Sequence, residues 1–258
     1  MDIQTVLALY NHEQRREAEY PDMTRVAMPR IVRYERAAPG TSIILYSDLD
    51  ETTADADIDE QLAYFSRNRM PFEWKAYACD RPADLVDRLV ARGLAADEPD
   101  AIMVLDVAAA PDTLLRRPSA DVRRLTDAAQ LADVVRVLEP VWGGKFDWIH
   151  TRLGAHMAIP DYLSVYVAYE AGLPACAGWT YYNRGHFAGL WGGSTVADYR
   201  GRGHYMAVLA ARVREARERG VAYLTVDAGS MSKPILTRHG FEVIAWATAC
   251  NWEPAETA

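Results

Sequence analysis

The segment Tyr199-Arg-Gly-Arg-Gly-His-Tyr205 places two glycines and two arginines between an apolar run and an alanine-rich stretch. This order predicts a strand, a tight turn and the start of a helix. The first backbone N–H groups of a helix have no partner within it, so a helix start attracts anions such as phosphate. Gly201 and Gly203 let the backbone approach a pyrophosphate, and Arg200 and Arg202 add cationic donors.

The residues after this segment continue the pattern. Apolar residues recur at helical spacing from Gly203, and Gly220 is suited to end that helix. A run rich in β-branched residues over 223–227 predicts a strand, and residues 232–239 predict a short helix before Gly240-Phe241. The sequence therefore predicts strand, phosphate loop, helix, strand and helix in that order.

Two other phosphate-binding motifs fit the chain less well. A P-loop needs Gly-x-x-x-x-Gly-Lys followed by Ser or Thr, and this string does not occur. A dinucleotide-binding fold needs a third glycine where this chain has Met206, although Asp227 lies near the distance expected for its acidic residue. The sequence disfavours both.

The string Arg200-Gly-Arg-Gly203-His-Tyr205 resembles the signature of the GCN5-related N-acetyltransferases (GNAT): Arg or Gln, two residues, Gly, one residue, then Gly or Ala. The resemblance extends from about residue 121 to Gly240-Phe241. It implies an N-acetyltransferase that moves an acetyl group from acetyl-CoA to a primary amine by direct attack. The alternative is a non-catalytic acyl-CoA sensor or regulatory module, and a structural partner that binds no CoA is a third option.

The resemblance also implies which residues bind the coenzyme. The edge of strand 187–195 would pair with the pantetheine arm where it separates from strand 223–227, and amides of residues 201–206 would hold the pyrophosphate. The expected acetyl-CoA residues are Gly193, Ser194, Thr195, Arg200, Gly201, Arg202, Gly203, His204, Tyr205, Met206 and Ser232. Thr195 and Ser194 are the catalytic candidates, because backbone amides near Thr195 would polarise the thioester carbonyl.

Three positions depart from the family pattern. Tyr205 replaces a small residue, so we expect its ring to pack away from the phosphates. Gly229 replaces an asparagine, which leaves Ser230 or Ser232 as the nearest hydroxyl substitute. Leu236 replaces the tyrosine that often protonates the leaving thiolate.

The general base is also missing from its usual position. Strict alternation along 187–195 predicts Trp191 and Gly193 on one face and Gly192 and Ser194 on the other, and neither face carries an acid. His150, His156 and His186 are expected to be ordinary surface or helix residues. The sequence identifies no base.

Aromatic residues are concentrated in the second half of the chain. The family admits the acceptor between its early helices and strand 187–195, so the resemblance assigns Trp142, Asp147, Trp148 and Trp191 to the acceptor pocket. Aromatic faces attract an ammonium group. Filling the core is the commoner role of tryptophan and remains the alternative for each ring. The aromatic content favours a small-molecule amine as acceptor.

The first half of the chain repeats features of the second. Asp80 precedes a short helix and a Gly-apolar pair at 93–94, as Asp227 precedes one at 240–241 with the same spacing. We therefore expect an α/β (α+β) protein with the GNAT fold, a mixed, mostly antiparallel sheet flanked by helices, in two halves. These are a degenerate domain over 1–115 and an acetyl-CoA-binding domain over 120–258.

The degenerate half is not expected to bind CoA. It has no Gly-x-Gly before its helix over 57–68, and the acids between Asp48 and Asp57 would repel a pyrophosphate. The simpler role of these acids is a solvated helix start with Asp55 or Asp57 as its cap.

Length, composition and charge limit the classes of protein to which this chain can belong. With 258 residues and 50% hydrophobic content, the chain can bury one large or two modest cores. A net charge of -8 disfavours nucleic acid and mildly favours a cationic acceptor. No apolar run could span a membrane and no signal peptide is evident, so we expect a cytoplasmic protein without a membrane partner. Cys79, Cys176 and Cys250 are expected to be reduced, no metal site is expected, and a homodimer is left open.

Overall fold

The computed structural model of the chain describes residues 1–254. Within them, the chain forms two compact units. The first comprises Met1–Ile102, Ala228–Met231 and the chain from Val243, and the second comprises Met103–Asp227 and Ser232–Glu242. This division differs from the predicted ranges, 1–115 and 120–258, chiefly because the chain returns to the first unit after Glu242. The assignment of residues 1–115 to a degenerate domain and of residues 120–258 to an acetyl-CoA-binding domain stays a prediction.

The strands of the first unit lie in the order β1 (Thr24–Ala27), β2 (Ile31–Glu35), β3 (Ser42–Ser47), β4 (Phe72–Tyr77) and β12 (Glu242–Trp252). Neighbouring strands run antiparallel, except that β3 and β4 run parallel. The short strand β5 (Ala95–Ala96) pairs with β12. The predicted strand over 72–77 is confirmed as β4.

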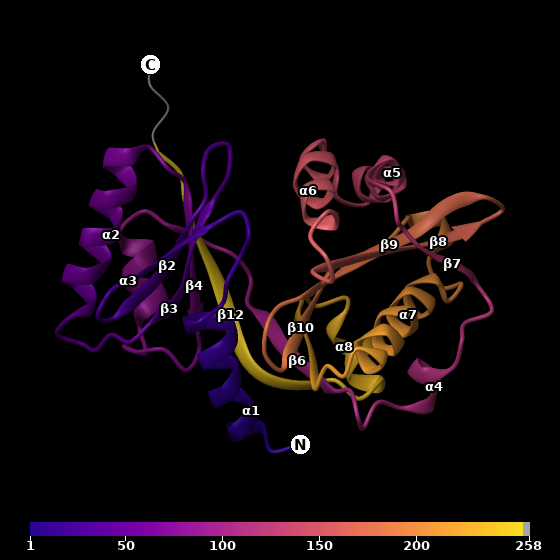
Figure 1. Cartoon of the computed structure of the whole chain (residues 1–258). Helices are drawn as coiled ribbons and strands as arrows, with labels where there is room; N and C mark the ends of the chain where they lie inside the picture. The colour runs from indigo at the N-terminus through magenta and orange to yellow at the C-terminus, as the bar shows by residue number, and fades with distance from the viewer. Residues whose placement is uncertain (255–258) are drawn as a thin grey trace. The chain divides into compact units, whose positions relative to one another are not determined.

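Helices α2 (Ala54–Asn68) and α3 (Leu85–Ala91) lie together on one side of these strands, as Figure 1 shows. Helix α1 (Ile3–Tyr10) continues directly into wider helical turns over Asn11–Arg16. The core beneath α2 includes Phe65, whose ring stacks on Phe72 of β4 with 4.2 Å between centroids. Burial of such aromatic pairs fixes the helix on the sheet.

The start of α2 differs from the prediction. Its N-cap is Thr53, which makes no side-chain cap bond, and in the turn before it Asp50 Oδ1 accepts hydrogen bonds from the backbone N–H groups of Thr52 and Thr53 at 2.8 and 2.9 Å. Together with the Thr52 hydroxyl, these donors lower the pKa of Asp50 to about 2. Asp55 and Asp57, the predicted caps, form ion pairs with arginines instead. The prediction was wrong because the helix begins before Asp55.

The strands of the second unit lie in the order β6 (Asp100–Asp106), β11 (Tyr223–Ala228), β10 (Phe187–Thr195), β9 (Leu173–Tyr182), β8 (Leu163–Glu170) and β7 (Asp121–Arg124). Strands β7 to β10 are antiparallel to their neighbours, and β10 and β11 are parallel. Its helices are α4 (Asp112–Leu115), α5 (Leu131–Trp142), α6 (Gly154–Met157), α7 (His204–Glu218) and α8 (Lys233–Arg238).

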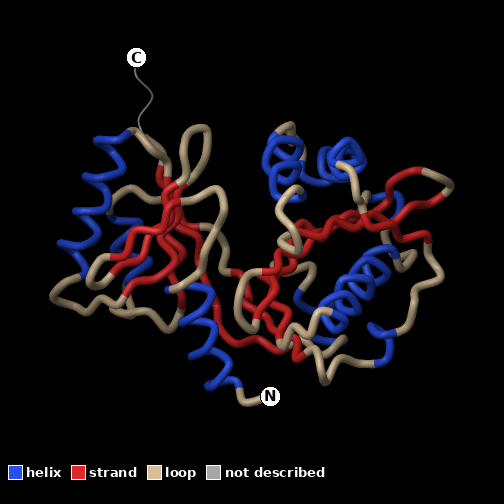
Figure 2. The backbone as a smooth tube through the Cα atoms, viewed as in Figure 1, coloured by secondary structure: helices blue, strands red, loops and turns tan. Residues whose placement is uncertain are grey.

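Helices cover both faces of the second sheet. Figures 1 and 2 show α5 and α6 on one side of β7–β9 and α7 on the other. Val134 and Leu138 of α5 pack with Val165 and Trp179 of the sheet, since α5 carries its apolar residues at helical spacing. The predicted fold class is confirmed: a mixed, mostly antiparallel sheet is flanked by helices.

None of the helices within residues 1–254 has the length and apolar character required to cross a bilayer. The expected cytoplasmic location stays a prediction.

Candidate active site

Strands β10 and β11 run side by side for only part of their length. Residues 187–189 pair with residues 223–225, and no later residue of β10 has a register partner on β11 in the described chain. Strand β10 nevertheless continues to Thr195, paired with β9 on its other side. The predicted separation of the two strands is therefore present. It leaves backbone N–H and C=O groups of β10 available to an extended, amide-bearing ligand.

A β-bulge interrupts β10 next to this free edge. The register against β9 shifts between Trp191 and Ser194, and the two intervening residues are glycines. At Gly192 (φ 63°), a Cβ would overlap the ring of Trp179, whereas at Gly193 it would lie 3.1 Å from the ring of Tyr205. Each glycine therefore allows an aromatic ring to pack closely on the bulge, Trp179 at the first and Tyr205 at the second.

The bulge changes which side chains share a face. Trp191 lies opposite Trp179, and Ser194 lies opposite Ala177, another core residue beneath α5. Trp191 and Ser194 are therefore on the same side of the sheet, so the predicted strict alternation was wrong. The extra residue of a bulge reverses the alternation beyond it.

The bulge also places Ser194, a predicted coenzyme-binding residue, next to Trp142, a predicted acceptor-pocket residue. Trp142, the last residue of α5, donates a hydrogen bond from Nε1 to Ser194 Oγ at 2.9 Å. Its side chain is otherwise open to solvent, with 64% of the residue exposed, and Trp191 and Trp148 are 52% and 42% exposed. These rings do not fill the core, unlike Trp179 at 6%. Asp147 is exposed in the turn after α5, and no contact links it to the tryptophans beyond its neighbour Trp148.

The loop after β10 has the conformation that its glycines allow. Gly201 and Gly203 have φ angles of 75° and 86°, in the left-handed region, and a Cβ on either would meet no atom within 4 Å. Backbone geometry, and not crowding, therefore requires glycine there. Gly203 is the N-cap of α7 and no side chain caps that helix. The first-turn residues His204, Tyr205 and Met206 thus present amides that have no acceptor within the helix.

Three side chains hold this loop in place. Arg200 Nε donates to the carbonyl oxygen of Thr195 at 3.2 Å. Arg202 pairs with Glu170 at the end of β8, and His204 Nε2 lies 2.6 Å from the other carboxylate oxygen of Glu170. The hydrogen bond from His204, followed by the contacts with Arg202, lowers the pKa of Glu170. Sequence reasoning missed Glu170, because only the fold brings the end of β8 to this loop.

Comparison with known proteins gives matches in structure but not in sequence. No protein-family model matches the chain, and no curated protein matches its sequence. A GCN5-related N-acetyltransferase from Kribbella flavida superposes with a TM-score of 0.72 and 12% identity, over 99% of this chain and 96% of that one. A tandem GNAT protein from the clavulanic acid biosynthesis pathway gives a TM-score of 0.61 at 11% identity, over 100% of this chain and 89% of that one.

The chain has the fold of the GCN5-related N-acetyltransferases. A conserved protein of unknown function from Staphylococcus epidermidis ATCC 12228 shares it, with a TM-score of 0.69 and 14% identity over 92% of this chain and 96% of that one. These matches extend over both units, so the whole chain has this architecture. At these identities, the likeness shows the GNAT fold alone.

Beneath the bulge of this GNAT fold lies a buried guanidinium. Arg212 of α7 is 2% exposed, and its Nη1 donates long hydrogen bonds of 3.4 and 3.3 Å to the carbonyl oxygens of Trp179 and Trp191. Its Nε has no partner, and no carboxylate in the described chain forms an ion pair with it. Desolvation lowers the pKa of Arg212. Sequence reasoning missed Arg212, because only its position on the predicted helix could be read from the sequence.

Four other sequence positions of interest lie in the second unit: Leu236, Ser232, Cys176 and Tyr205. Leu236, where the family pattern has a tyrosine, is fully buried in α8, and Ser232 begins that helix with its carbonyl accepting from the amides of residues 235 and 236. Burial raises the pKa of the Cys176 thiol, opposite Thr195 on β9, to about 11. Tyr205 packs against Cys176 and Val208, as predicted.

Proposed function

We propose that this protein is an N-acetyltransferase that uses acetyl-CoA to acetylate a primary amine of a small molecule. The observation that supports this most directly is the junction of three features in the GNAT fold: the free edge of β10, its glycine bulge and the uncapped start of α7. Few other ligands have both an extended amide chain and a pyrophosphate, which these features suit.

Acetyl-CoA supplies an activated acetyl thioester. Gly193, Ser194 and Thr195 would bind the pantetheine arm along the edge of β10. The amides of residues 201–206 would bind the pyrophosphate, with Arg200, Arg202 and Ser232 nearby. The buried Arg212 Nε lacks a hydrogen-bond partner in the described chain, which fits a site that is completed by a polar ligand.

Transfer by direct attack suits these residues. Backbone amides near Thr195 and Ser194 stabilise negative charge developing on the thioester oxygen. Arg212, on the opposite side of the bulge from Trp142, adds positive potential through a dry interior where charge is weakly screened. The Cys176 thiol is protonated at neutral pH, because its pKa is about 11, and so it is no nucleophile. Positioning of the amine supplies most of the remaining acceleration.

The acceptor would bind beside the bulge on the α5 side. Trp142, Trp148 and Trp191 have exposed rings there, and such faces attract an ammonium group. Asp147 adds a carboxylate in the same turn region as Trp148. The Trp142 to Ser194 hydrogen bond couples this surface to the coenzyme strand. The net charge of -8 would favour approach of a cation over the whole surface.

Two measurements test the proposal. Titration calorimetry of acetyl-CoA should show one site per chain, and a thiol-release assay with a panel of small amines should show acceptor-dependent turnover. Binding without turnover for any amine class would favour the alternative, a non-catalytic acyl-CoA sensor, which the buried Leu236 and the absence of an acid on β10 also fit. Absence of binding would contradict both.

A matched pair of variants locates the coenzyme. Gly203→Glu places a carboxylate at the start of α7 and should weaken acetyl-CoA binding at least about a hundredfold, by charge repulsion and backbone strain. Gly220→Glu is the control, since Gly220 (φ 71°) is equally strained and also has open space around its Cβ position. Equal loss in both variants would show that strain, and not the site, is responsible.

A further inference from the structure

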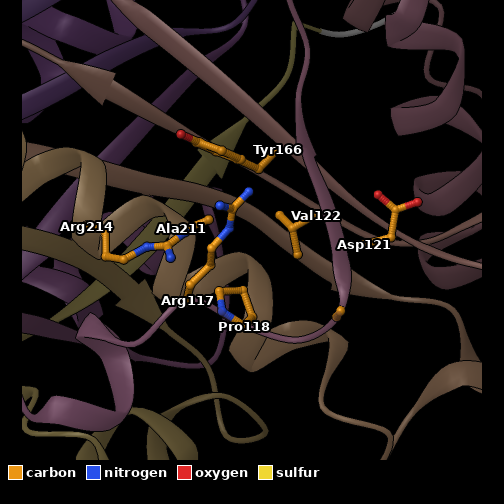
Figure 3. Close-up of a pocket in the computed structure, with 8 residues that line it drawn as sticks. Arg117, Pro118, Asp121, Val122, Tyr166, Ala211 and Arg214 are labelled. Atoms are coloured by element: carbon orange, nitrogen blue, oxygen red, sulfur yellow. The ribbon is translucent and has the colours of Figure 1, made fainter.

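A cavity of about 230 Å³ lies in the second unit, away from the coenzyme loop. Its walls come from the segment 117–122, which leads into β7, from Tyr166 of β8 and from Ala211 and Arg214 of α7. Figure 3 shows Arg117 of that segment and Arg214 of α7 reaching toward one another beneath the ring of Tyr166. Two guanidinium groups from different elements therefore share one cavity.

Neither arginine has a counter-ion in the described chain. The structure gives no hydrogen bond or ion pair to the side chain of Arg117 or Arg214, whereas the acids around them are already paired. Asp121, which also lines the cavity, is paired with Arg123. Glu215, next to Arg214, accepts from Ser164, Tyr166 and Arg219. Two guanidinium groups without a counter-ion therefore line the same cavity, an arrangement that an anion would stabilise.

This cavity is separate from the start of α7. Arg214 lies ten residues after His204, which corresponds to about 15 Å along the helix axis at 1.5 Å per residue. Its position faces β7 and β8, whereas the coenzyme loop follows β10. A ligand here would leave the loop and the edge of β10 free.

We propose that Arg117 and Arg214 form a second binding site for a small, doubly charged oxyanion, either a phosphate or a dicarboxylate. Each guanidinium presents a planar pair of donors that matches two oxygens of such a group. The phenol hydroxyl of Tyr166 donates to Glu215, so the two arginines carry the recognition. The site is independent of the proposed acetyl transfer and would exist in a protein that lacked this activity.

Amide chemical shifts of the ¹⁵N-labelled full chain test the proposal during titration with sodium phosphate, sodium succinate or sodium chloride at matched ionic strength. We expect saturable shifts of residues 117 and 119–122 with phosphate or succinate, and not with chloride. The stronger of the two probes identifies the ligand class. Saturable shifts confined to residues 201–206 would show binding at the coenzyme loop only and would overturn the proposal, as would equal responses to all three salts.

Single substitutions assign the response to the two arginines. Arg117→Gln and Arg214→Gln should each weaken binding by about tenfold, because each removes a charged hydrogen-bonding group. Arg116→Gln and Arg217→Gln are the controls, since both residues are exposed neighbours that do not line the cavity. Thermal unfolding without added anion shows whether each variant is folded. Equal weakening by all four would indicate general charge attraction and would contradict the proposal.

Discussion

The two units contain the same strand–helix–strand arrangement, but the residues that precede the helix differ in charge. In the first, β3 and β4 run parallel around α2, and in the second, β10 and β11 run parallel around α7. Each parallel pair has three registered residue pairs. Neither helix has a side-chain cap, but the turn before α2 carries the Asp50 carboxylate, whereas the loop before α7 carries Arg200 and Arg202. The charges beside the second helix start therefore favour an anionic ligand, and the charge beside the first opposes one.

Each unit also buries an arginine, and the two arginines differ in whether a carboxylate pairs with them. Arg15 donates to Leu45 O, to Asn11 Oδ1 and to both oxygens of Asp80, and it lies 3.7 Å from the centre of the Tyr77 ring. Burial, the largest influence, acts to lower the pKa of Arg15, but the charge and hydrogen bonds of Asp80 together with Tyr77 and Cys79 raise the net pKa. Arg212 has two long hydrogen bonds and no carboxylate. The buried arginine of the first unit is therefore neutralised within its own unit, and that of the second is not.

The largest expected effect comes from removing the counter-ion of Arg15 in the first unit. Asp80→Asn leaves the buried Arg15 without its counter-ion and should lower the free energy of unfolding by about 3–5 kcal/mol. Urea denaturation measures this. The control is Asp84→Asn, because Asp84 is exposed in its pair with Arg88 and its loss should cost less than about 0.5 kcal/mol. Similar losses in both variants would contradict a special role for the Arg15 pair.

The opposite result is expected for the buried arginine of the second unit. Arg212→Met removes a charge that has no partner, so stability should stay constant or rise, while kcat for acetyl transfer should fall by about tenfold to a hundredfold. Arg212→Lys keeps the charge and should retain more activity than the Met variant. Arg217→Met is the exposed control on the same helix. A loss of stability as large as that of Asp80→Asn would contradict the proposed difference between Arg15 and Arg212.

A smaller effect is expected at the contact that holds the coenzyme loop. Glu170→Gln should weaken acetyl-CoA binding by about tenfold, because Arg202 and His204 lose their shared anion. The pKa of Glu170 lies below its ordinary value of 4.5, so the contact stabilises the loop above that pH and is lost as the pH falls through the lowered pKa. Calorimetric titrations across this range should show a pH dependence in the parent that the variant lacks. Glu218→Gln, at the other end of α7, should behave as the parent does.

The smallest effect is expected from removing the carboxylate before the first helix. Asp50→Ala removes the acceptor of the Thr52 and Thr53 amides in the turn before α2 and should lower the unfolding temperature by about 2–4 °C. Acetyl-CoA stoichiometry should stay at one per chain, because α2 has no glycine loop of positive φ before it. Asp48→Ala is the exposed control in the same loop. A second equivalent of coenzyme in the Asp50 variant would mean that this carboxylate alone distinguishes the units.

Local features of this chain could be predicted from its sequence. The loop over 200–203 and the helix after it follow from glycine positions and apolar spacing, which act within a few residues. Strand 72–77 follows from alternation and is found as β4. The packing of Tyr205 could be predicted because its ring is too large to lie beside a bound phosphate.

Features that depend on distant residues could not be predicted. Glu170 reaches His204 only after β8 and β10 have paired through β9. The bulge at Gly192 follows from the ring of Trp179 on the neighbouring strand, which spacing along β10 does not reveal. Asp55 and Asp57 form ion pairs with arginines far away in the sequence and do not cap α2, which the acid run alone does not reveal.

The return of β12 to the first unit determines when that unit can be completed during synthesis. Residues 72–77 of β4 pair with residues 247–252, which the ribosome adds only after the whole of the second unit. The edge of β4 therefore lacks this partner strand while the second unit is being synthesised. Translation order makes synthesis of the second unit a prerequisite for completing the sheet of the first.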